Sequence, residues 1–444
     1  MLIKTVKLAE IISLILLALI LGACRSSRAA LTANPAAVPA KLLPSDADVE
    51  QQTIRFLEER IKRDPEDFIA ANKLAGQYLQ RVRETGDVTY LNLALKAARA
   101  SLSTLPAEQN TGGLTALAQA EYASHEFAAA RDHALQLTKL EPNKSYCYQI
   151  LGDALLELGE YEKAEAAFRQ MEQLGGIQGL TRVTIEQRIA RLAALRGDAN
   201  GAQRHFSNAL TLALALPAPP RETVAWCRWQ LGETAFSVGD YATAERHYRD
   251  ALTTFPDYFR ALASLGRIRA AQADIAGAIE QYEHAVRIIP DPSFVAALGD
   301  LYKLAGREKD AAAQYSLVEK IGRLNELNGT LYNRQLALFY ADHDLKPDAA
   351  YTNASQEFTV RHDIYGADAL AWTALKAGKI TEAQTVIKEA LRLGTRDARL
   401  FYHAGMIAQA AGDRGGAREY LKQALALNPQ FDPMQATIAK RVLG

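Results

Sequence analysis

The chain has 444 residues, of which 49% are hydrophobic, and its 51 basic residues balance 51 acidic ones, so its formal net charge is zero. This composition is typical of a globular protein and excludes a disordered one. Because basic residues do not outnumber acidic ones, the composition argues against nucleic-acid binding. Three cysteines in so long a chain exclude a disulfide scaffold. A chain of this length forms either two or three domains or a repeat array.

The first 23 residues have the pattern of a secretory signal peptide. Lys4 and Lys7 precede an apolar run from Ile11 to Leu21, and small residues follow this run. The apolar run is well short of the ~20 residues that a membrane-spanning helix needs. We therefore expect residues 1–23 to be removed from the mature protein.

The residues Leu21-Gly22-Ala23-Cys24 resemble the lipobox of bacterial lipoproteins. The resemblance implies that Cys24 becomes the first mature residue and carries acyl chains on its sulfur and its amino group, which would form a stable membrane anchor. Arg25 follows the cysteine in place of aspartate, and the sorting pattern of lipoproteins then favours the outer membrane. The alternative is an uncleaved signal that anchors the protein in the inner membrane.

Residues 24–45 are rich in alanine, proline and serine and lack helical periodicity, which indicates a flexible tether. A helix is expected from about Asp46 to Arg63, since Pro65 follows it closely. This helix would precede the repeats as a leading half-repeat.

Beyond the tether the sequence repeats itself at intervals of about 34 residues. Leu-Gly pairs occur at 151–152, 231–232, 265–266 and 298–299, and an alanine follows each glycine twelve residues later. We expect the glycine and the alanine to let two paired helices approach closely, and a large residue four positions further on to fill the gap between units. Glycines expected to end the first helix in a left-handed conformation occur in six units, at Gly159, Gly197, Gly239, Gly306, Gly378 and Gly412.

These residues resemble the tetratricopeptide repeat, a helix–turn–helix unit with Leu-Gly, Tyr, Ala, Phe and Pro at these offsets. The best match is the unit from Ala225 to Tyr258. Ten units begin near residues 68, 111, 145, 183, 225, 259, 292, 330, 364 and 398. The resemblance implies an all-α solenoid over residues 46–431, a right-handed superhelix whose concave groove is lined by the first helix of each pair.

Residues 432–444 are predicted to form a capping helix. Asp432 is a suitable N-cap and Pro433 a suitable first helical residue. Met434, Ile438 and Val442 recur every four residues, so we expect them to form the apolar stripe that covers the last repeat.

The resemblance further implies that partners touch positions 2, 5, 9, 12 and 13 of each first helix. On this chain those positions include aromatic and charged residues, types that are common in binding hot spots. The groove candidates are Tyr122, Tyr146, Asp153, Arg191, Trp226, Trp229, Glu233, Phe236, Arg267, Arg334, Tyr365, Trp372 and Tyr402. The alternative for the tryptophans is a place in the core between helices, which a small shift of the frame would give.

Catalytic and metal-binding motifs are not found in the sequence. It has no phosphate-binding loop, nucleophile elbow, HExxH or CxxC motif. The scattered histidines are expected to lie on solvated faces of second helices. Cys147 and Cys227 stand two repeats apart, roughly 20 Å by helix spacing, so they should be buried thiols and not a disulfide.

The function that these observations favour is a scaffold or adaptor on the bacterial cell envelope, held to the membrane by its lipid alone. It would bind protein or peptide segments in its groove, in an envelope, pilus or secretion assembly, without nucleic acid, metal or small-molecule cofactor. The alternative is an enzyme or accessory protein of cell-envelope polysaccharide or peptidoglycan metabolism. Its weakness is that no stretch remains for a catalytic domain, so we expect no enzymatic activity.

Overall fold

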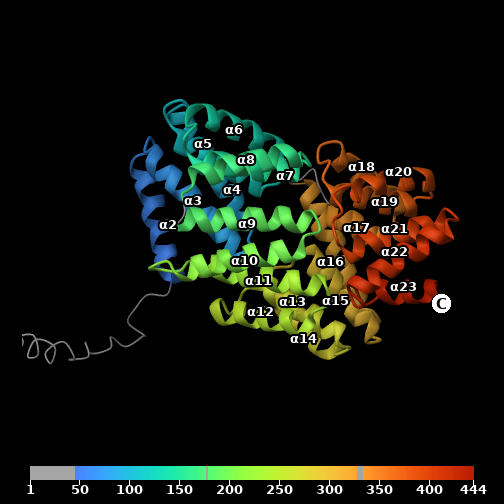
Figure 1. The fold of residues 1–444 in the computed structure, drawn as a ribbon. Helices are drawn as coiled ribbons and strands as arrows, with labels where there is room; N and C mark the ends of the chain where they lie inside the picture. The colour runs from blue at the N-terminus through green and yellow to red at the C-terminus, as the bar shows by residue number, and fades with distance from the viewer. Residues whose placement is uncertain (1–45, 177–178, 328–333) are drawn as a thin grey trace, which may run out of the picture. The chain divides into compact units, whose positions relative to one another are not determined.

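The structure is a computed structural model that describes residues 46–176, 179–327 and 334–444. Within these ranges it contains helices and no strand, as expected (Figure 1). The chain divides into two units, 1–56 and 57–444, and the packing described below lies within the second. The leading helix α2 spans Asp46–Arg63, the predicted range. The predicted signal peptide, the tether and Cys24 lie outside the described residues.

Ten consecutive helix pairs follow α2, and the two members of each pair contact one another along their lengths. The first helices are α3 (Phe68–Thr85), α5 (Thr111–Ala123), α7 (Ser145–Glu157), α9 (Gly179–Leu195), α11 (Arg221–Ser237), α13 (Phe259–Ala271), α15 (Pro292–Leu304), α17 (Arg334–Asp342), α19 (Ile364–Lys376) and α21 (Ala398–Ala410). The second helices are α4 (Thr89–Thr104), α6 (Phe127–Leu140), α8 (Tyr161–Leu174), α10 (Ala199–Leu214), α12 (Tyr241–Thr254), α14 (Ile275–Ile288), α16 (Glu308–Leu327), α18 (Pro347–Phe358), α20 (Ile380–Ala390) and α22 (Arg414–Leu427).

The predicted repeat frame agrees with these helices. Seven first helices begin at the predicted residue, whereas α9 and α11 begin four residues earlier than 183 and 225. In α11 the earlier start has a local reason, because Pro220 stands just before the first turn, where a missing N–H costs nothing. The predicted start at 330 lies outside the described residues, and α17 is described from Arg334.

The turns between paired helices follow the predicted glycine pattern. All six glycines adopt left-handed backbone conformations, with φ between 73° and 81°, as Gly159 at 79° illustrates. Where a repeat lacks this glycine, another residue takes the conformation, such as His125 at φ 63° or Ala273 at φ 62°. The turn geometry is therefore set by the helix pair, and glycine is the residue that adopts it without strain.

An aspartate directly after the left-handed residue begins the second helix in several repeats. The side chains of Asp198, Asp240, Asp274 and Asp413 each accept a hydrogen bond from a backbone N–H of the first turn of their helix. Such N-caps satisfy one of the free donors at the helix start. A left-handed residue and an aspartate together thus end one helix and start the next.

The glycine of each Leu-Gly pair lies under the large residue of its own second helix. A Cβ atom on Gly152 would lie 2.3 Å from Phe168 Cε1, and one on Gly232 would lie 2.3 Å from Tyr248 Cε1. The large residue therefore packs on the glycine of its own repeat. It also contacts the next repeat, as predicted, since the Phe206 ring lies 5.8 Å from that of Trp226 and the Tyr315 ring 5.5 Å from that of Phe339. Because the ring occupies the space that a methyl group would take, these repeats require glycine there.

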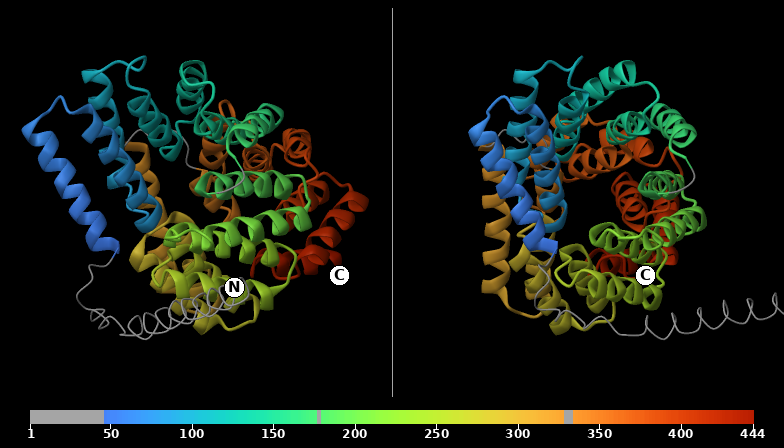
Figure 2. Two further views of the ribbon diagram at one scale, coloured as in Figure 1. Left: turned by 60° about the vertical axis from the view of Figure 1, so that its left-hand side comes forward. Right: turned by 90° about the vertical axis from the view of Figure 1, so that its left-hand side faces the viewer.

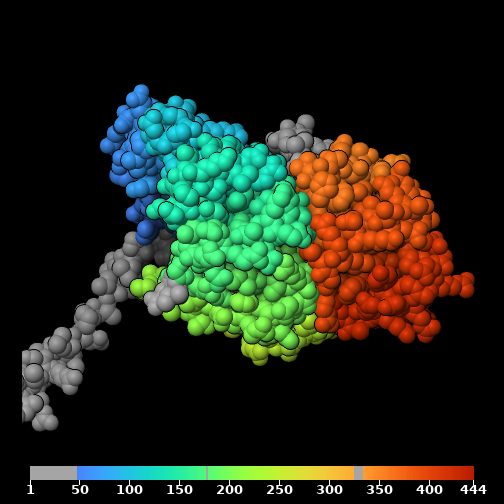
Figure 3. Space-filling model, turned by 45° about the horizontal axis from the view of Figure 1, so that its top comes forward, coloured from blue at the N-terminus to red at the C-terminus, as the bar shows by residue number. Residues whose placement is uncertain are grey.

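The helix pairs wind so that segments about 200 residues apart meet. Ile364 N donates to Tyr161 Oη at 2.8 Å, and Asn428 Nδ2 donates to Phe236 O at 2.7 Å. Figure 2 shows the coil from two sides, and in Figure 3 the surface of α19–α23, orange to red, abuts the teal and green surface of the earlier repeats. We call these contacts, between residues 157–161, 195–197, 236–241 and residues 361–364, 394–396, 428–430, the inter-turn seam.

Backbone approaches backbone at the seam. A Cβ atom on Gly159 would lie 2.3 Å from His362 O, and one on Gly197 would lie 2.5 Å from Gly394 O. Apolar side chains of α7 and α8 also share one buried cluster with side chains of α19 and α21. Successive turns of the superhelix are consequently packed against each other and not merely adjacent.

The capping helix α23 spans Gln435–Leu443 and begins later than predicted. Asp432 Oδ1 does accept from the N–H groups of Met434 and Gln435, at 2.9 and 2.8 Å. The predicted apolar stripe is confirmed only in part. Ile438 packs against the cluster of the last repeat, but Val442 is 37% exposed, and the buried residues of the helix are Gln435, Ala436 and Ala439. The alanines present a small surface that allows close packing against the last repeat.

None of the helices in the described ranges combines the length and the apolar character that crossing a membrane requires.

Candidate functional site

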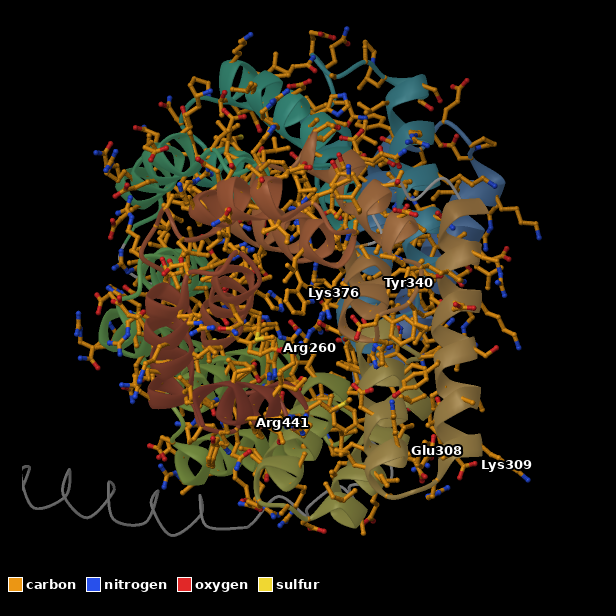
Figure 4. The ribbon with its side chains drawn as sticks, turned by 90° about the vertical axis from the view of Figure 1, so that its right-hand side faces the viewer. Arg260, Glu308, Lys309, Tyr340, Lys376 and Arg441 are labelled. Atoms are coloured by element: carbon orange, nitrogen blue, oxygen red, sulfur yellow. The ribbon has the colours of Figure 1, made fainter. Side chains whose placement is uncertain are left out.

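We call positions 2, 5, 9, 12 and 13 of the first helices the inner face. The groove candidates all occupy these positions. Figure 4 looks along the coil and shows Arg260 and Lys376 inside the ring of helices. These residues stand at positions 2 and 13 of the repeats that begin at 259 and 364. The frame positions therefore point toward the interior of the coil at these two places.

Five aromatic candidates keep part of their surface accessible. Tyr122, Tyr146, Trp226 and Trp229 are half-buried, and Tyr365 is 38% exposed. Burial raises the pKa of the Tyr365 hydroxyl well above its usual value. Large aromatic side chains that keep part of their surface accessible are common in binding interfaces.

The two neighbouring tryptophans also contribute to packing. The ring of Trp226 lies 5.8 Å from that of Phe206, edge to face, and Trp229 Nε1 donates to Ser264 Oγ at 3.0 Å. Both pack against a buried cluster of the fifth and sixth repeats, and Trp226 also packs against one of the fourth and fifth. They stand at the boundary between core and surface, between the two alternatives that the sequence left open.

Three aromatic candidates are buried in the core. Phe236, Trp372 and Tyr402 are 5%, 3% and 2% exposed. Trp372 stacks on His403 with ring centres 4.3 Å apart, and its Nε1 donates to Asp342 Oδ1 at 2.8 Å. Burial removes these three from any accessible surface, and for Trp372 the covering ring belongs to the next repeat.

Four of the charged candidates form ion pairs with charged residues of a neighbouring repeat. Asp153 Oδ2 accepts from Arg188 Nη2 at 2.7 Å, Arg191 pairs with Glu157, and Arg267 pairs with Glu233. Asp153, Arg191, Glu233 and Arg267 thus already have partners within the chain. Sequence reasoning missed Arg188 and Glu157, although the signal was present as opposite charges 34 or 35 residues apart.

Arg334 belongs to a larger buried network at the seam. Its Nη2 lies 2.7 Å from both Glu357 Oε1 and Asp363 Oδ2. Arg361 lies 3.0 Å from Glu357 Oε1 and reaches across the seam to Glu157 Oε2 at 2.7 Å. The role of Arg334 here is to hold the chain together, and the sequence pattern did not indicate Glu357 or Arg361.

Glu233 is the centre of a second network. Burial alone would raise the pKa of its carboxyl, but the charge of Arg267 and hydrogen bonds from Arg267, Tyr248 and Ser264 lower it. Tyr248 Oη and Ser264 Oγ donate to Glu233 Oε1 at 2.7 and 2.8 Å. Because Trp229 donates to Ser264, the orientation of its indole is tied to this ionised carboxylate.

The histidines differ from the prediction in one respect. His403 is 0% exposed, and its Nδ1 lies 2.8 Å from Asp368 Oδ1. The prediction that the histidines lie on solvated faces is therefore wrong for His403, and also for His343, whose side chain is 9% exposed. Cys147 and Cys227 are free and buried, as predicted, and burial raises the pKa of each thiol to about 11.

A pH-dependent contribution to stability is expected from His343. Burial lowers its pKa, but the hydrogen bond and charge of Asp300, at 2.7 Å from Nε2, outweigh burial, so the pKa is raised. A raised pKa in the folded state stabilises the fold fully below the unfolded value of about 6.5, and this stabilisation is lost as the pH rises through the folded value. His343→Gln should reduce the free energy of unfolding at about pH 6 more than at about pH 8.

Urea unfolding of the wild type and His343→Gln at several pH values measures this effect. His284→Gln is the control, because that side chain is 42% exposed and its carboxylate neighbour Asp257 is 3.7 Å away. A wild type and a His343→Gln variant with parallel pH profiles would contradict the prediction.

The comparisons with known proteins concern the repeats. Tetratricopeptide-repeat models match residues 115–176, 181–257, 230–293 and 369–432, which together make up more than half of the chain. A search of curated proteins finds no match.

The solved structures that match this chain include the following three. The type IV pilus biogenesis factor PilW is 16% identical, covers 47% of this chain and 91% of its own, and has a TM-score of 0.39. BtubC from P. vanneervenii is 20% identical, with 46% and 92% covered and a TM-score of 0.38. Yeast Tom70 is 13% identical, with 88% and 92% covered and a TM-score of 0.38. On the family models and its helix pairs, the chain belongs to the tetratricopeptide-repeat family.

Proposed function

We propose that this protein is a scaffold of the bacterial cell envelope that binds protein segments on its inner face. The observation that supports this proposal best is the set of aromatic side chains left partly accessible there. Tyr365 is 38% exposed, and Tyr122, Tyr146, Trp226 and Trp229 are half-buried. Aromatic surfaces of this kind supply much of the binding energy in protein interfaces.

The charged inner-face residues have a different part in this proposal. Since Asp153, Arg191, Glu233 and Arg267 pair with neighbours, a partner would have to compete with existing ion pairs for them. They keep the repeats in register and position the aromatic side chains. An envelope, pilus or secretion assembly is the setting in which such a scaffold would serve.

Tyr365→Ala should weaken partner capture without unfolding the protein. Unlike Trp226 and Trp229, the Tyr365 side chain has more than a third of its surface exposed, so its removal leaves little cavity. We expect a crosslinking pull-down from intact envelopes to lose at least half of the partners captured by the wild type, since hot-spot truncations cost about 2 kcal/mol or more.

Tyr420→Ala is the matched control, because Tyr420 is a half-buried tyrosine on the second helix α22. It should retain the wild-type partners. If both variants retain all partners while their circular dichroism is unchanged, the inner face is not the binding surface.

The lipid anchor is a separate part of the proposal and rests on the lipobox residues before Cys24. Cys24→Ser removes the sulfur that would carry the acyl chains. We expect this variant to lose metabolic labelling by palmitate and to accumulate as the uncleaved precursor. Equal palmitate labelling of variant and wild type would contradict the anchor and leave the binding proposal in place.

A further inference from the structure

Helices α9, α10 and α11 are longer than their neighbours. They have 17, 16 and 17 residues, whereas α5 to α8 and α12 to α15 have 13 or 14. Two to four extra residues lengthen a helix by about 3–6 Å. The start of α9, the end of α10 and the start of α11 lie together, since Val183, Ala213 and Val224 share a buried cluster. Figure 1 shows the connection between α10 and α11 projecting beyond the neighbouring helix α12.

The projecting end, which we call the apolar tip, consists of residues 179–181 and 214–220. None of its ten residues is buried, and Leu180 and Leu214 are 50% and 47% exposed. Nine of the ten are glycine, alanine, leucine or proline, and Thr181 is the exception. Exposed apolar side chains grouped in this way mark a surface that meets a partner protein or a membrane.

Charged residues are absent from the sequence around the tip. No aspartate, glutamate, lysine or arginine occurs between Glu172 and Arg182 or between Arg204 and Arg221. Several other connections between repeats each contain an acid or a base, as do residues 141–144, 255–258, 289–291 and 391–397. A connection in water tolerates charge, whereas the apolar part of a bilayer strongly disfavours it.

The backbone of the α10–α11 connection, residues 215–220, has few donors without a partner. Ala215 and Leu216 donate their N–H groups to carbonyl oxygens in the last turn of α10, at 3.1 and 3.3 Å. Three of the remaining four residues are prolines, which have no N–H group. Because an unpaired N–H costs free energy when it leaves water, this connection can enter an apolar phase at a lower cost than most loops.

We propose that the apolar tip inserts its leucine side chains into the surface of a lipid bilayer. Leu180 and Leu214 would enter the boundary between headgroups and acyl chains, to a depth of about 5–10 Å. Arg182, which pairs with Glu172, and Arg221 directly follow the two segments of the tip, and arginine side chains are accommodated among headgroups. This inference rests on the membrane location in the proposed function and is independent of binding at the inner face.

A bilayer fits the tip better than a second protein does. A specific protein interface engages about 20–30 residues on each side and contains about ten hydrogen bonds. The tip offers ten residues, and only Thr181 among them has a polar side chain. A lipid surface requires only apolar area, which two half-exposed leucines and the adjoining alanines and prolines supply.

The test uses a fluorophore on the tip of the full chain, reconstituted in phosphatidylcholine vesicles. Leu214→Cys is labelled with a nitrobenzoxadiazole maleimide, and the native Cys147 and Cys227 escape labelling because both are 0% exposed. The unsubstituted protein, treated in the same way, corrects for any label on Cys24.

A lipid that carries a nitroxide near the headgroup end of its acyl chain quenches fluorophores at that depth. It should quench the label of Leu214→Cys at least about two-fold more strongly than the label of Leu135→Cys. Leu135 is the matched control, because it is a 41% exposed leucine on the second helix α6.

Ala218→Cys provides a second label if Leu214→Cys fails to fold, since Ala218 is exposed and lies outside the helices. In the Ala218→Cys protein, Leu180→Asp should lower the quenching at least about two-fold, because a carboxylate is disfavoured below the headgroups. Leu135→Asp should leave it unchanged.

Equal quenching of the labels at Leu214→Cys and Leu135→Cys overturns the inference. A tip label that the nitroxide lipid does not quench, but whose emission shifts to the blue as protein concentration rises, indicates contact with a second copy and overturns it as well. If Cys24→Ser loses palmitate labelling in either case, the membrane location stands and the role of the tip fails alone. Unchanged palmitate labelling together with an unquenched tip means that both fail.

Discussion

Gly159→Ala is expected to open the contact between the two turns of the superhelix, whereas Gly378→Ala should leave it closed. Both glycines end a first helix with nearly the same left-handed backbone, at φ 79° and 75°. Alanine in this conformation costs about 1–2 kcal/mol at either position. The two sites differ in what a methyl group would meet, since nothing lies within 4 Å of a Cβ at Gly378.

At Gly159 the methyl group would collide with backbone atoms. It would lie 2.3 Å from His362 O and 2.7 Å from Asp363 N, and the backbone has no rotamer by which to move away. We expect Gly159→Ala to cost about 3 kcal/mol or more of stability in total, with the excess over Gly378→Ala coming from the lost inter-turn seam.

Hydrogen exchange read by mass spectrometry distinguishes the two variants. The amides of His362 and Ile364 donate across the seam to Leu158 O and Tyr161 Oη, so they should lose protection in Gly159→Ala. Small-angle scattering should show an increased radius of gyration in the same variant. Equal exchange at residues 361–364 in both variants would contradict the argument.

Arg361→Ala should destabilise the inter-turn seam by an amount comparable to Gly159→Ala, in this case by removing a charge. Arg361 is 8% exposed and lies 2.7 Å from Glu157 Oε2, 3.0 Å from Glu357 Oε1 and over the ring of Phe127 at 4.6 Å. Removing one member of a buried ion-pair network leaves acids without full compensation, which costs about 3–5 kcal/mol. We expect the lower part of this range, because Glu157 keeps Arg191 and Glu357 keeps Arg334.

Urea unfolding followed by circular dichroism measures this loss. In a repeat array each pair still contacts its neighbours, so the helical signal should persist at low urea while the later repeats unfold earlier. Arg418→Ala is the control, because Arg418 is exposed on α22, and it should change stability by less than about 0.5 kcal/mol. If Arg361→Ala also lowered the free energy of unfolding by less than about 0.5 kcal/mol, this ion-pair network would not be what stabilises the seam.

The candidate site was predictable only in part, and the tryptophans show why. The repeat frame placed Trp226, Trp229 and Trp372 at inner-face positions alike, yet Trp372 is 3% exposed and the other two are half-buried. Trp372 is covered because His403, one repeat later, stacks on its ring. A frame position specifies a direction on a helix, whereas exposure depends on the size of the neighbouring side chains.

The ion pairs between repeats could have been predicted from the sequence, because they join residues one repeat length apart. Glu233 and Arg267, and Glu157 and Arg191, are both separated by 34 residues. The search for groove residues treated each charge singly and so assigned these residues to a partner. A search for opposite charges at the repeat spacing would have assigned them to the chain itself.

The sequence by itself determined the number of helix pairs, the start of most first helices and the glycines of their turns. These features are local, because each repeat folds against itself and its neighbours, and the same residues recur in every unit. The seam was decided only by the tertiary structure. Arg361 meets Glu157 across 204 residues because small rotations between successive helix pairs add up to one turn of the superhelix. The residues of a single repeat do not reveal how large that total rotation is.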